Sequence, residues 1–262
     1  MLSPAAEKVI NDYFNLPYQN ITGVRCPYYN NTRKKARGQL GVLVGKGSPK
    51  DIVEESKIIS IQYQLGLFDK NGTLSWPSPE LIRKFLIEQN LGIECSGFVS
   101  HVLKAHYLES KKIDITKKLQ LCEPGKIFRK IIAKLRPIEN MDVKVFASNI
   151  NSEVIEIKNF NYSVIKPGDF IIMLETGPSQ KRNHIILITS NENSEAKYVH
   201  SRSWSSEGKY GHGVSQGKIV FNINSNNILD GNWIENDISE DKNETYQEAK
   251  NAKVLEIRRL KI

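Results

Sequence analysis

The sequence predicts an α+β protein, because helical patterns fill its first half and strand patterns dominate its second half. Through much of residues 1–140, apolar residues recur at three- and four-residue spacing, as in helices with one buried face. From residue 142 onward, short apolar runs alternate with turn-forming residues, which is typical of antiparallel strands. A cysteine at the start of a predicted helix, within residues 93–103, is the most informative feature of the chain.

The first 85 residues are predicted to form a mostly helical N-terminal extension. Its opening apolar pattern stops at Leu16-Pro17, and clusters of glycine and proline separate the later helical stretches. The remaining residues, 86–262, are assigned to a second domain that carries the candidate site. The expected helices of the extension lie within residues 1–22, in part of 32–46, at about 50–63 and at 80–89.

Cys95 is placed in the first turn of an amphipathic helix. The apolar face of this helix is formed by Phe98, Val99, Val102 and Leu103. A thiol at a helix N-terminus faces unpaired backbone N–H groups and the positive end of the helix dipole. We therefore expect its pKa to fall from about 8.5 into the range of about 3.5–7.5, which makes Cys95 a candidate nucleophile. The alternative is a buried structural thiol.

A lysine-rich stretch follows this helix, over about residues 108–140. Its apolar residues form a helical stripe, so we expect a basic helical insertion. The whole chain has a net charge of +8 and a pI near 9.2, and this basic surface could contact an anionic polymer. We favour the interpretation that these charges form solvated helix faces, because aromatic residues are not interleaved with them.

The C-terminal half is predicted to form strands, two of which carry histidines. Pro167-Gly168 is a turn that leads into a buried apolar run. His184 opens the next strand, after a polar tip, and His200 lies on the strand after that. The expected strands lie at residues 143–146, 154–157, about 164–173, 183–188, 196–201 and 218–223, with an edge strand at 253–258.

Cys95, His184 and His200 together meet the requirements of thiol catalysis. These are a nucleophile, an imidazole that takes and returns its proton, and a group that holds this imidazole in the right tautomer. We expect His200 to orient His184, because strands position side chains more rigidly than loops do. His212, in a glycine-rich loop, is the alternative orienting residue.

Four sequence blocks resemble, in the same order, the motifs of the NlpC/P60 cysteine peptidases. Residues 94–99 (ECSGFV) are similar to the D-C-S-G-F-V nucleophile segment of that family, and 166–171 (KPGDFI) to its P-G-D-L-V strand entry. Residues 183–188 (NHIILI) resemble its H-V-G-I-Y-I strand, and 198–201 (YVHS) its F-I-H-A segment. The blocks span about residues 86–223 and form a fairly specific signal.

The resemblance implies a papain-like core in which the catalytic helix packs on an antiparallel sheet, with Cys95, His184 and His200 as catalytic residues. It also implies a tyrosine near the cysteine that helps to hold the oxyanion, but residues 77–94 contain none. Tyr63 or the pair Tyr28-Tyr29 are the candidates for this role. We further expect Ser96, through its backbone, and His212 to contribute to substrate binding.

The chain departs from the family in two other respects. The segment between Cys95 and His184 is longer than in compact members, because of the lysine-rich stretch. Ile186 stands where the family usually has a small residue, so the packing of that strand must differ.

The expected activity is cleavage of an amide bond, in a peptide of the cell-wall type that contains D-amino acids. One alternative is a related amidase or acyltransferase that uses the same residues on another acyl group. Another is a catalytically idle basic module that binds an anionic polymer. The N-terminus lacks the pattern of a secretory signal, so we expect a cytoplasmic protein or one exported by another route.

Composition narrows the remaining possibilities. The 262 residues are 39% hydrophobic and 25% charged, as in ordinary globular proteins, and no apolar run approaches the ~20 residues of a membrane span. The three cysteines are odd in number and lack CxxC spacing, which argues against a disulfide framework. No histidine pair has zincin spacing, so neither a metal nor another cofactor is expected.

Overall fold

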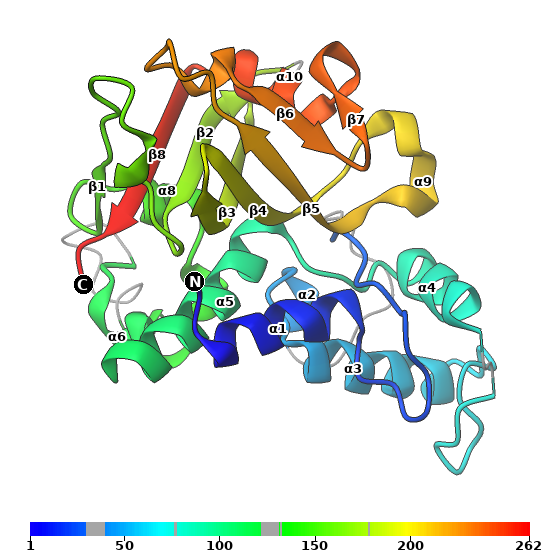
Figure 1. Ribbon diagram of the computed structural model, residues 1–262. Helices are drawn as coiled ribbons and strands as arrows, with labels where there is room; N and C mark the ends of the chain where they lie inside the picture. Colours follow the sequence, from blue (N-terminus) through cyan, green and yellow to red (C-terminus); the bar gives the residue numbers. More distant parts are fainter. Residues whose placement is uncertain (30–39, 76–77, 122–130, 132, 178) are drawn as a thin grey trace.

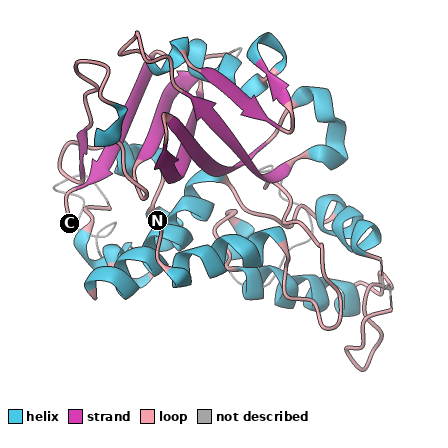
Figure 2. Cartoon of the chain, in the orientation of Figure 1, coloured by secondary structure: helices cyan, strands magenta, loops and turns pink. Residues whose placement is uncertain are grey.

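The computed structural model describes residues 1–29, 40–75, 78–121, 131, 133–177 and 179–262. Its helices gather on one side of a large twisted sheet, with smaller elements around the rest of it (Figures 1 and 2). The helices are α1 (Pro4–Phe14), α2 (Leu40–Leu43), α3 (Pro49–Gln62), α4 (Pro79–Glu88), α5 (Cys95–Lys111), α6 (Ile115–Lys118), α8 (Val143–Ala147), α9 (Gly208–Gly211) and α10 (Glu244–Lys250).

The sheet has eight strands, and all neighbouring pairs are antiparallel. Their spatial order is β1-β8-β2-β3-β4-β5-β6-β7, so the C-terminal strand lies between the first and second strands. The strands are β1 (Ser152–Val154), β2 (Phe170–Thr176), β3 (Arg182–Glu192), β4 (Glu195–Arg202), β5 (Gly213–Val220), β6 (Asn232–Glu235), β7 (Ile238–Ser239) and β8 (Val254–Leu260).

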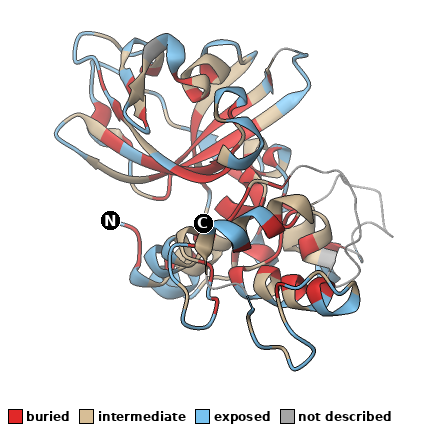
Figure 3. Cartoon of the chain, turned by 90° about the vertical axis from the view of Figure 1, so that its right-hand side faces the viewer, coloured by how far each residue is buried: buried red, intermediate tan, exposed pale blue. Residues whose placement is uncertain are grey.

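Both faces of the central strands are buried, as the band of buried residues through the sheet shows (Figure 3). Phe170 and Ile172 of β2 face a cluster that includes α1, α3 and α5, whereas Ile171 and Met173 face a second cluster on the opposite side. This alternation explains why β2 and β3 are continuous apolar runs in the sequence. Ile186 belongs to the second cluster, which has room for its large side chain.

Capping residues explain where the helices around the candidate site begin and end. α1, α3 and α4 each begin with a serine N-cap followed by proline, and in α3 Ser48 and Asp51 form a reciprocal capping box. α5 ends at Lys111, because Lys112 at its C-cap has a left-handed φ of 60° that stops the helix.

The predicted α+β class and the antiparallel sheet are confirmed, and four details of the prediction were wrong. Residues 143–146 form helix α8, because the Asp142 side chain accepts a hydrogen bond from the N–H of Val145 and caps it. The strand expected at 154–157 ends at Val154, and the one expected at 218–223 is β5, which starts earlier. The C-terminal strand β8 is an interior strand.

The stretch at 108–140 is helical over most of its described residues, as expected, but in separate short pieces. α5 ends at Lys111, the four-residue α6 follows, residues 131 and 133–135 are helical, and residues 138–140 form a single 3-10 turn. Residues 122–130 and 132 of this stretch lie outside the described part of the chain. So do residues 30–39, which include the start of the region 32–46 that was predicted to be partly helical.

One hydrophobic cluster joins the two predicted domains. It contains Ala6, Ile59 and Ile82 from the first 85 residues, together with Phe98 of α5 and Ile185 of β3. The boundary at residue 85 stays a sequence-based prediction. In the described ranges, no helix combines the length and apolarity that a membrane crossing requires.

Candidate active site

Cys95 is the first residue of α5 and is buried, with 5% of its surface exposed. The start of α5 is fixed by close packing against the loop that precedes α3. The N–H of Glu94 donates to the carbonyl of Gly45 at 2.9 Å, and a Cβ on Gly97 would come within 2.6 Å of that same carbonyl oxygen. Glycine is therefore the residue that fits at position 97, two residues after the thiol.

A buried ammonium lies beneath this first turn. The Nζ of Lys46 donates to the hydroxyl of Ser96 and to the carbonyl of Met141, both at 2.6 Å, and it pairs with the carboxylate of Glu94. The Ser96 hydroxyl donates in turn to Glu94 at 2.6 Å. The Ser96 side chain is therefore committed to this network, and its expected role in substrate binding rests on its backbone alone.

The environment of Cys95 favours the thiol over the thiolate in the free protein. Burial, followed by the neighbouring Glu94 carboxylate, raises the pKa of Cys95 to about 12. The N–H groups of Ile185 and Ser96 and the charge of Lys46 oppose this shift without cancelling it. The expectation of a lowered pKa was wrong, because desolvation and a like charge outweigh the helix terminus here.

The first turn of α5 meets the sheet where β3 and β4 stop pairing. Their ladder ends at Leu187–Val199, so His184 and His200 lie beyond it. The Ser201 hydroxyl donates to the carbonyl of Ile93 at 2.7 Å, which ties β4 to the segment before α5. The Cys95 sulfur lies by the N–H of Ile185, directly after His184 in the chain. No hydrogen bond joins Cys95 to His184 within the part of the chain that the structure describes.

His184 and His200 are hydrogen-bonded to each other, with 2.7 Å between Nε2 of His184 and Nδ1 of His200. Nε2 of His200 lies 3.0 Å from the Oε2 atom of Glu235 on β6. All three side chains are nearly or fully buried. Strands β3, β4 and β6 thus contribute a continuous chain of hydrogen bonds from Glu235 through His200 to His184.

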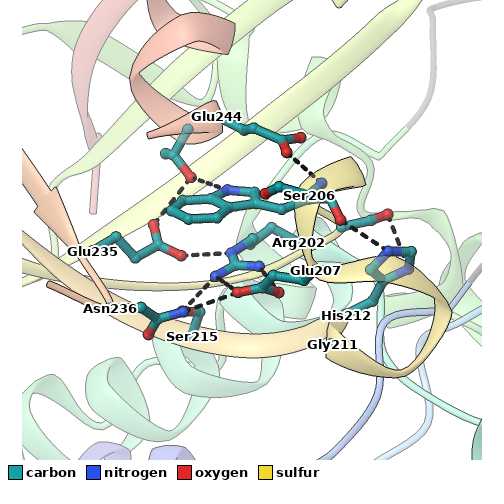
Figure 4. Close-up of polar contacts among 12 residues, drawn as sticks. Arg202, Ser206, Glu207, Gly211, His212, Ser215, Glu235, Asn236 and Glu244 are labelled. Atoms are coloured by element: carbon teal, nitrogen blue, oxygen red, sulfur yellow. Dashed lines mark hydrogen bonds and ion pairs between the residues drawn. The ribbon is translucent and has the colours of Figure 1, made fainter. Parts of the chain in front are cut away.

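Glu235 is held as a carboxylate. Burial opposes its ionisation, but His200 and Arg202 bring its pKa well below the ordinary value. It accepts hydrogen bonds from Tyr198 at 3.1 Å and from Thr245 at 3.0 Å, in addition to His200. Its other oxygen, Oε1, pairs with the guanidinium of Arg202 (Figure 4).

This carboxylate determines the tautomers of both histidines. An ionised Glu235 can only accept, so Nε2 of His200 carries a proton, and Nδ1 of a neutral His200 must then accept. His184 consequently donates from Nε2, and its Nδ1 is left with a free lone pair. Burial brings the pKa of His184 well below its ordinary value, so this imidazole is neutral at pH 7.

The free nitrogen of His184 keeps some contact with solvent. Every fully buried side-chain nitrogen or oxygen atom of the described residues has a hydrogen-bond partner, and Nδ1 of His184 has none, so part of the 6% of this residue that is exposed belongs to that atom. His184 lines a pocket of about 130 Å³ together with Tyr28, Arg182 and four other residues. A residue with an available lone pair therefore lines a small pocket.

Tyr28 is the tyrosine that the structure brings to this pocket. Burial raises its pKa well above the ordinary value, and the nearby Cys95 and Glu94 add to this shift. Tyr63 instead follows the end of α3 and packs against the cluster that holds α1, α3 and α5. Of the two candidates for the oxyanion role, Tyr28 is the one that lines the pocket.

His212 does not orient His184. Its Nδ1 lies 3.1 Å from the Ser203 hydroxyl, and its Nε2 lies 3.1 Å from the carbonyl of Trp204 (Figure 4). It lines a second, larger pocket of about 950 Å³. The structure thus gives His200 the position next to His184, and His212 a place on the wall of the adjoining groove.

Sequence reasoning missed Glu235 and Arg202. Arg202 is 3% exposed, pairs with both Glu235 and Glu207, and stacks on Trp204 with its guanidinium carbon 3.9 Å from the ring centroid. One signal was available: Arg202 follows His200 by two residues, which places both on the same face of β4. No local pattern distinguishes Glu235 from the other acids of the C-terminal region.

The structure also bears on the cysteines and on the question of a metal site. Cys26 and Cys95 are free and buried, and Cys122 lies outside the described residues. Across the ranges that the structure describes, no three histidine, cysteine or acidic side chains gather as metal ligands would.

Comparisons with protein-family models, with curated proteins and with solved structures give no match for this chain. What the site can do therefore follows from its own geometry.

Proposed function

We propose that this protein is a thiol hydrolase that cleaves an amide bond, with Cys95 as nucleophile and His184 as base. The observation that carries the proposal is the Glu235–His200–His184 chain, which leaves a free lone pair on Nδ1 of His184, while the Cys95 sulfur lies by the N–H of the next residue, Ile185. The four sequence blocks that resemble NlpC/P60 peptidases support the same assignment and a papain-like core.

The raised pKa of Cys95 defines the order of proton transfer. The thiol stays protonated in the free protein, and His184 removes its proton as the sulfur attacks the carbonyl carbon. The N–H groups at the start of α5 stabilise the oxyanion that forms. His184 then gives its proton to the leaving amine, and water, deprotonated by the same imidazole, hydrolyses the thioester.

His200 and Glu235 are positioning residues in this mechanism. When His184 takes the thiol proton it becomes an imidazolium, which is stabilised by the hydrogen bond to His200 and, through it, by the Glu235 carboxylate. The carboxylate stays ionised throughout, because Arg202 neutralises its second oxygen.

The substrate that we propose is a peptide with D-amino acids, of the kind found in cell walls. The resemblance supports this class, and the polar lining of both pockets suits a peptide rich in amide and charged groups. An acyltransferase of the same fold would use the same residues. It would differ only in passing the acyl group from Cys95 to an added amine instead of to water.

The test is hydrolysis of wall-derived peptides by the wild type and by Cys95→Ala and His184→Ala. We expect both variants to lose activity by orders of magnitude while their circular dichroism and thermal unfolding stay close to wild type. His106→Gln is the matched histidine control, because His106 lies farther along α5, where its Nδ1 accepts a hydrogen bond from the N–H of Ser3. Full activity in either site variant would end the proposal.

A further inference from the structure

An ion pair on the rim of the His184 pocket contains an arginine with unused donors. Nη2 of Arg182 lies 2.6 Å from Oε1 of Glu248, and the two side chains are 51% and 19% exposed. A guanidinium has five N–H donors, and Arg182 contacts no other acceptor within the described ranges. The other arginine of the pocket, Arg202, is buried, with its donors taken by Glu235, Glu207 and Ser215.

Arg182 has a defined position relative to the base. It lies two residues before His184 on β3, so both side chains project from the same face, about 7 Å apart along the strand. Both line the small pocket. Arg182 and Glu248 also line the larger pocket, so they stand where the small pocket opens into the groove.

Glu248 fixes the direction of this guanidinium. Its carboxylate lies on α10, which packs against β2, and it pairs with only one of the terminal nitrogens of Arg182. Gly177, at the end of β2, lies under the same guanidinium, because a Cβ there would come within 2.5 Å of Nε. The arginine is therefore held by an acid on one side and packs on backbone on another, and it lines the pocket with donors that Glu248 does not use.

We propose that Arg182 binds a carboxylate on the leaving group, so that the protein releases amino acids with a free carboxyl group. This inference rests on the proposed function. His184 must protonate the leaving nitrogen, so the leaving group lies against His184, and Arg182 is the next charged side chain along the same strand face. In an amino acid, the amine and the carboxylate are separated by one carbon, which matches this neighbouring placement of acid–base group and guanidinium.

The experiment compares matched substrates that differ only in the charge of the leaving group. The probes are acetylated di- and tripeptides of L- and D-amino acids, each made with a free C-terminal carboxylate and as the C-terminal amide. We expect wild-type kcat/KM to favour the carboxylate form by about 10- to 100-fold, as for a charge-assisted hydrogen bond. In Arg182→Gln this preference should fall to near one, while hydrolysis of the amide form continues.

Lys181→Gln is the control, because it removes the same charge from the adjacent, exposed residue. It should keep the wild-type preference. Calorimetric binding of both peptide forms to Cys95→Ala gives a second readout, in which the carboxylate form should bind at least tenfold more tightly and lose this advantage with Arg182→Gln.

Two results would overturn the inference, and they differ in what they say about the proposed function. If the wild type hydrolyses both forms equally in a Cys95-dependent manner, the hydrolase stands and the role of Arg182 is refuted. If the wild type hydrolyses neither form and Cys95→Ala binds neither, both proposals fail together.

Discussion

Replacing Glu235 by glutamine should reverse the tautomers of the two histidines. Arg202 has only donors, so the side-chain oxygen of the introduced glutamine must take the Oε1 position that faces it. The amide NH2 then occupies the Oε2 position and donates to Nε2 of His200. His200 consequently carries its proton on Nδ1 and donates to His184, whose own proton moves to its Nδ1. That nitrogen can no longer accept a proton from the thiol.

The size of both effects follows from the contacts of Glu235. A wrong tautomer next to an intact nucleophile lowers kcat by up to about 10⁴-fold, and loss of general-base action by about 10²–10⁴-fold. Breaking a buried ion pair costs about 3–5 kcal/mol of unfolding free energy, and we expect the lower end here, because Arg202 keeps its pairing with Glu207. The variant should therefore fold, with little activity.

Three measurements test this reasoning together: kcat/KM, denaturant unfolding, and the protonation of each imidazole nitrogen by nitrogen-15 NMR. Glu207→Gln is the matched control, because it removes a carboxylate from the same arginine without contacting either histidine. Its activity should stay within a few-fold of wild type. The reasoning is refuted if Glu235→Gln keeps full activity, or if its His184 still carries the proton on Nε2.

Other expected outcomes follow from the same geometry. Because burial lowers the pKa of His184, the acid limb of the kcat/KM profile should lie below pH 6.5, with activity lost as pH falls through that pKa; a limb above 6.5 would contradict this. Gly97→Ala should cost about 1–3 kcal/mol of unfolding free energy by denaturant titration, because its Cβ would meet the carbonyl oxygen of Gly45 at 2.6 Å. An unchanged midpoint would refute the close packing. Burial raises the pKa of the Cys26 thiol, so the unfolded state ionises first and stability should fall as pH rises above about 9. Cys26→Ala should reduce that alkaline loss, whereas an equal loss in both proteins would exclude Cys26 as its source.

The sequence was sufficient where the signal is local. The helix that starts at Cys95, the strand that starts near His184 and the antiparallel order of the sheet all follow from apolar spacing and turn residues. The strand prediction for residues 143–146 was wrong for an equally local reason. Their alternation of apolar and polar residues is typical of a strand, but the cap from Asp142 stabilises a short helix instead. Capping and alternation compete, and the pattern alone does not say which prevails.

The electrostatics of the site could not be predicted in the same way. The pKa of Cys95 depends on how deeply the thiol is buried and on the nearby Glu94 carboxylate, and neither depth nor distance is encoded in spacing. Glu235 lies on β6 and contacts His200 on β4 across the intervening strand β5. Its role can therefore be recognised only when the order of the strands in the sheet is known.

The position of Lys46 has a consequence for the size of the working unit. This residue comes from the N-terminal region, yet its charge offsets the Glu94 carboxylate next to Cys95, and it donates a hydrogen bond to Ser96. A shortened protein that began after residue 85 would expose the apolar side of α5. It would also leave the Glu94 carboxylate without its counterion, Lys46. The first third of the chain thus contributes directly to the surroundings of the Cys95 sulfur, and engineered versions of this protein have to retain it.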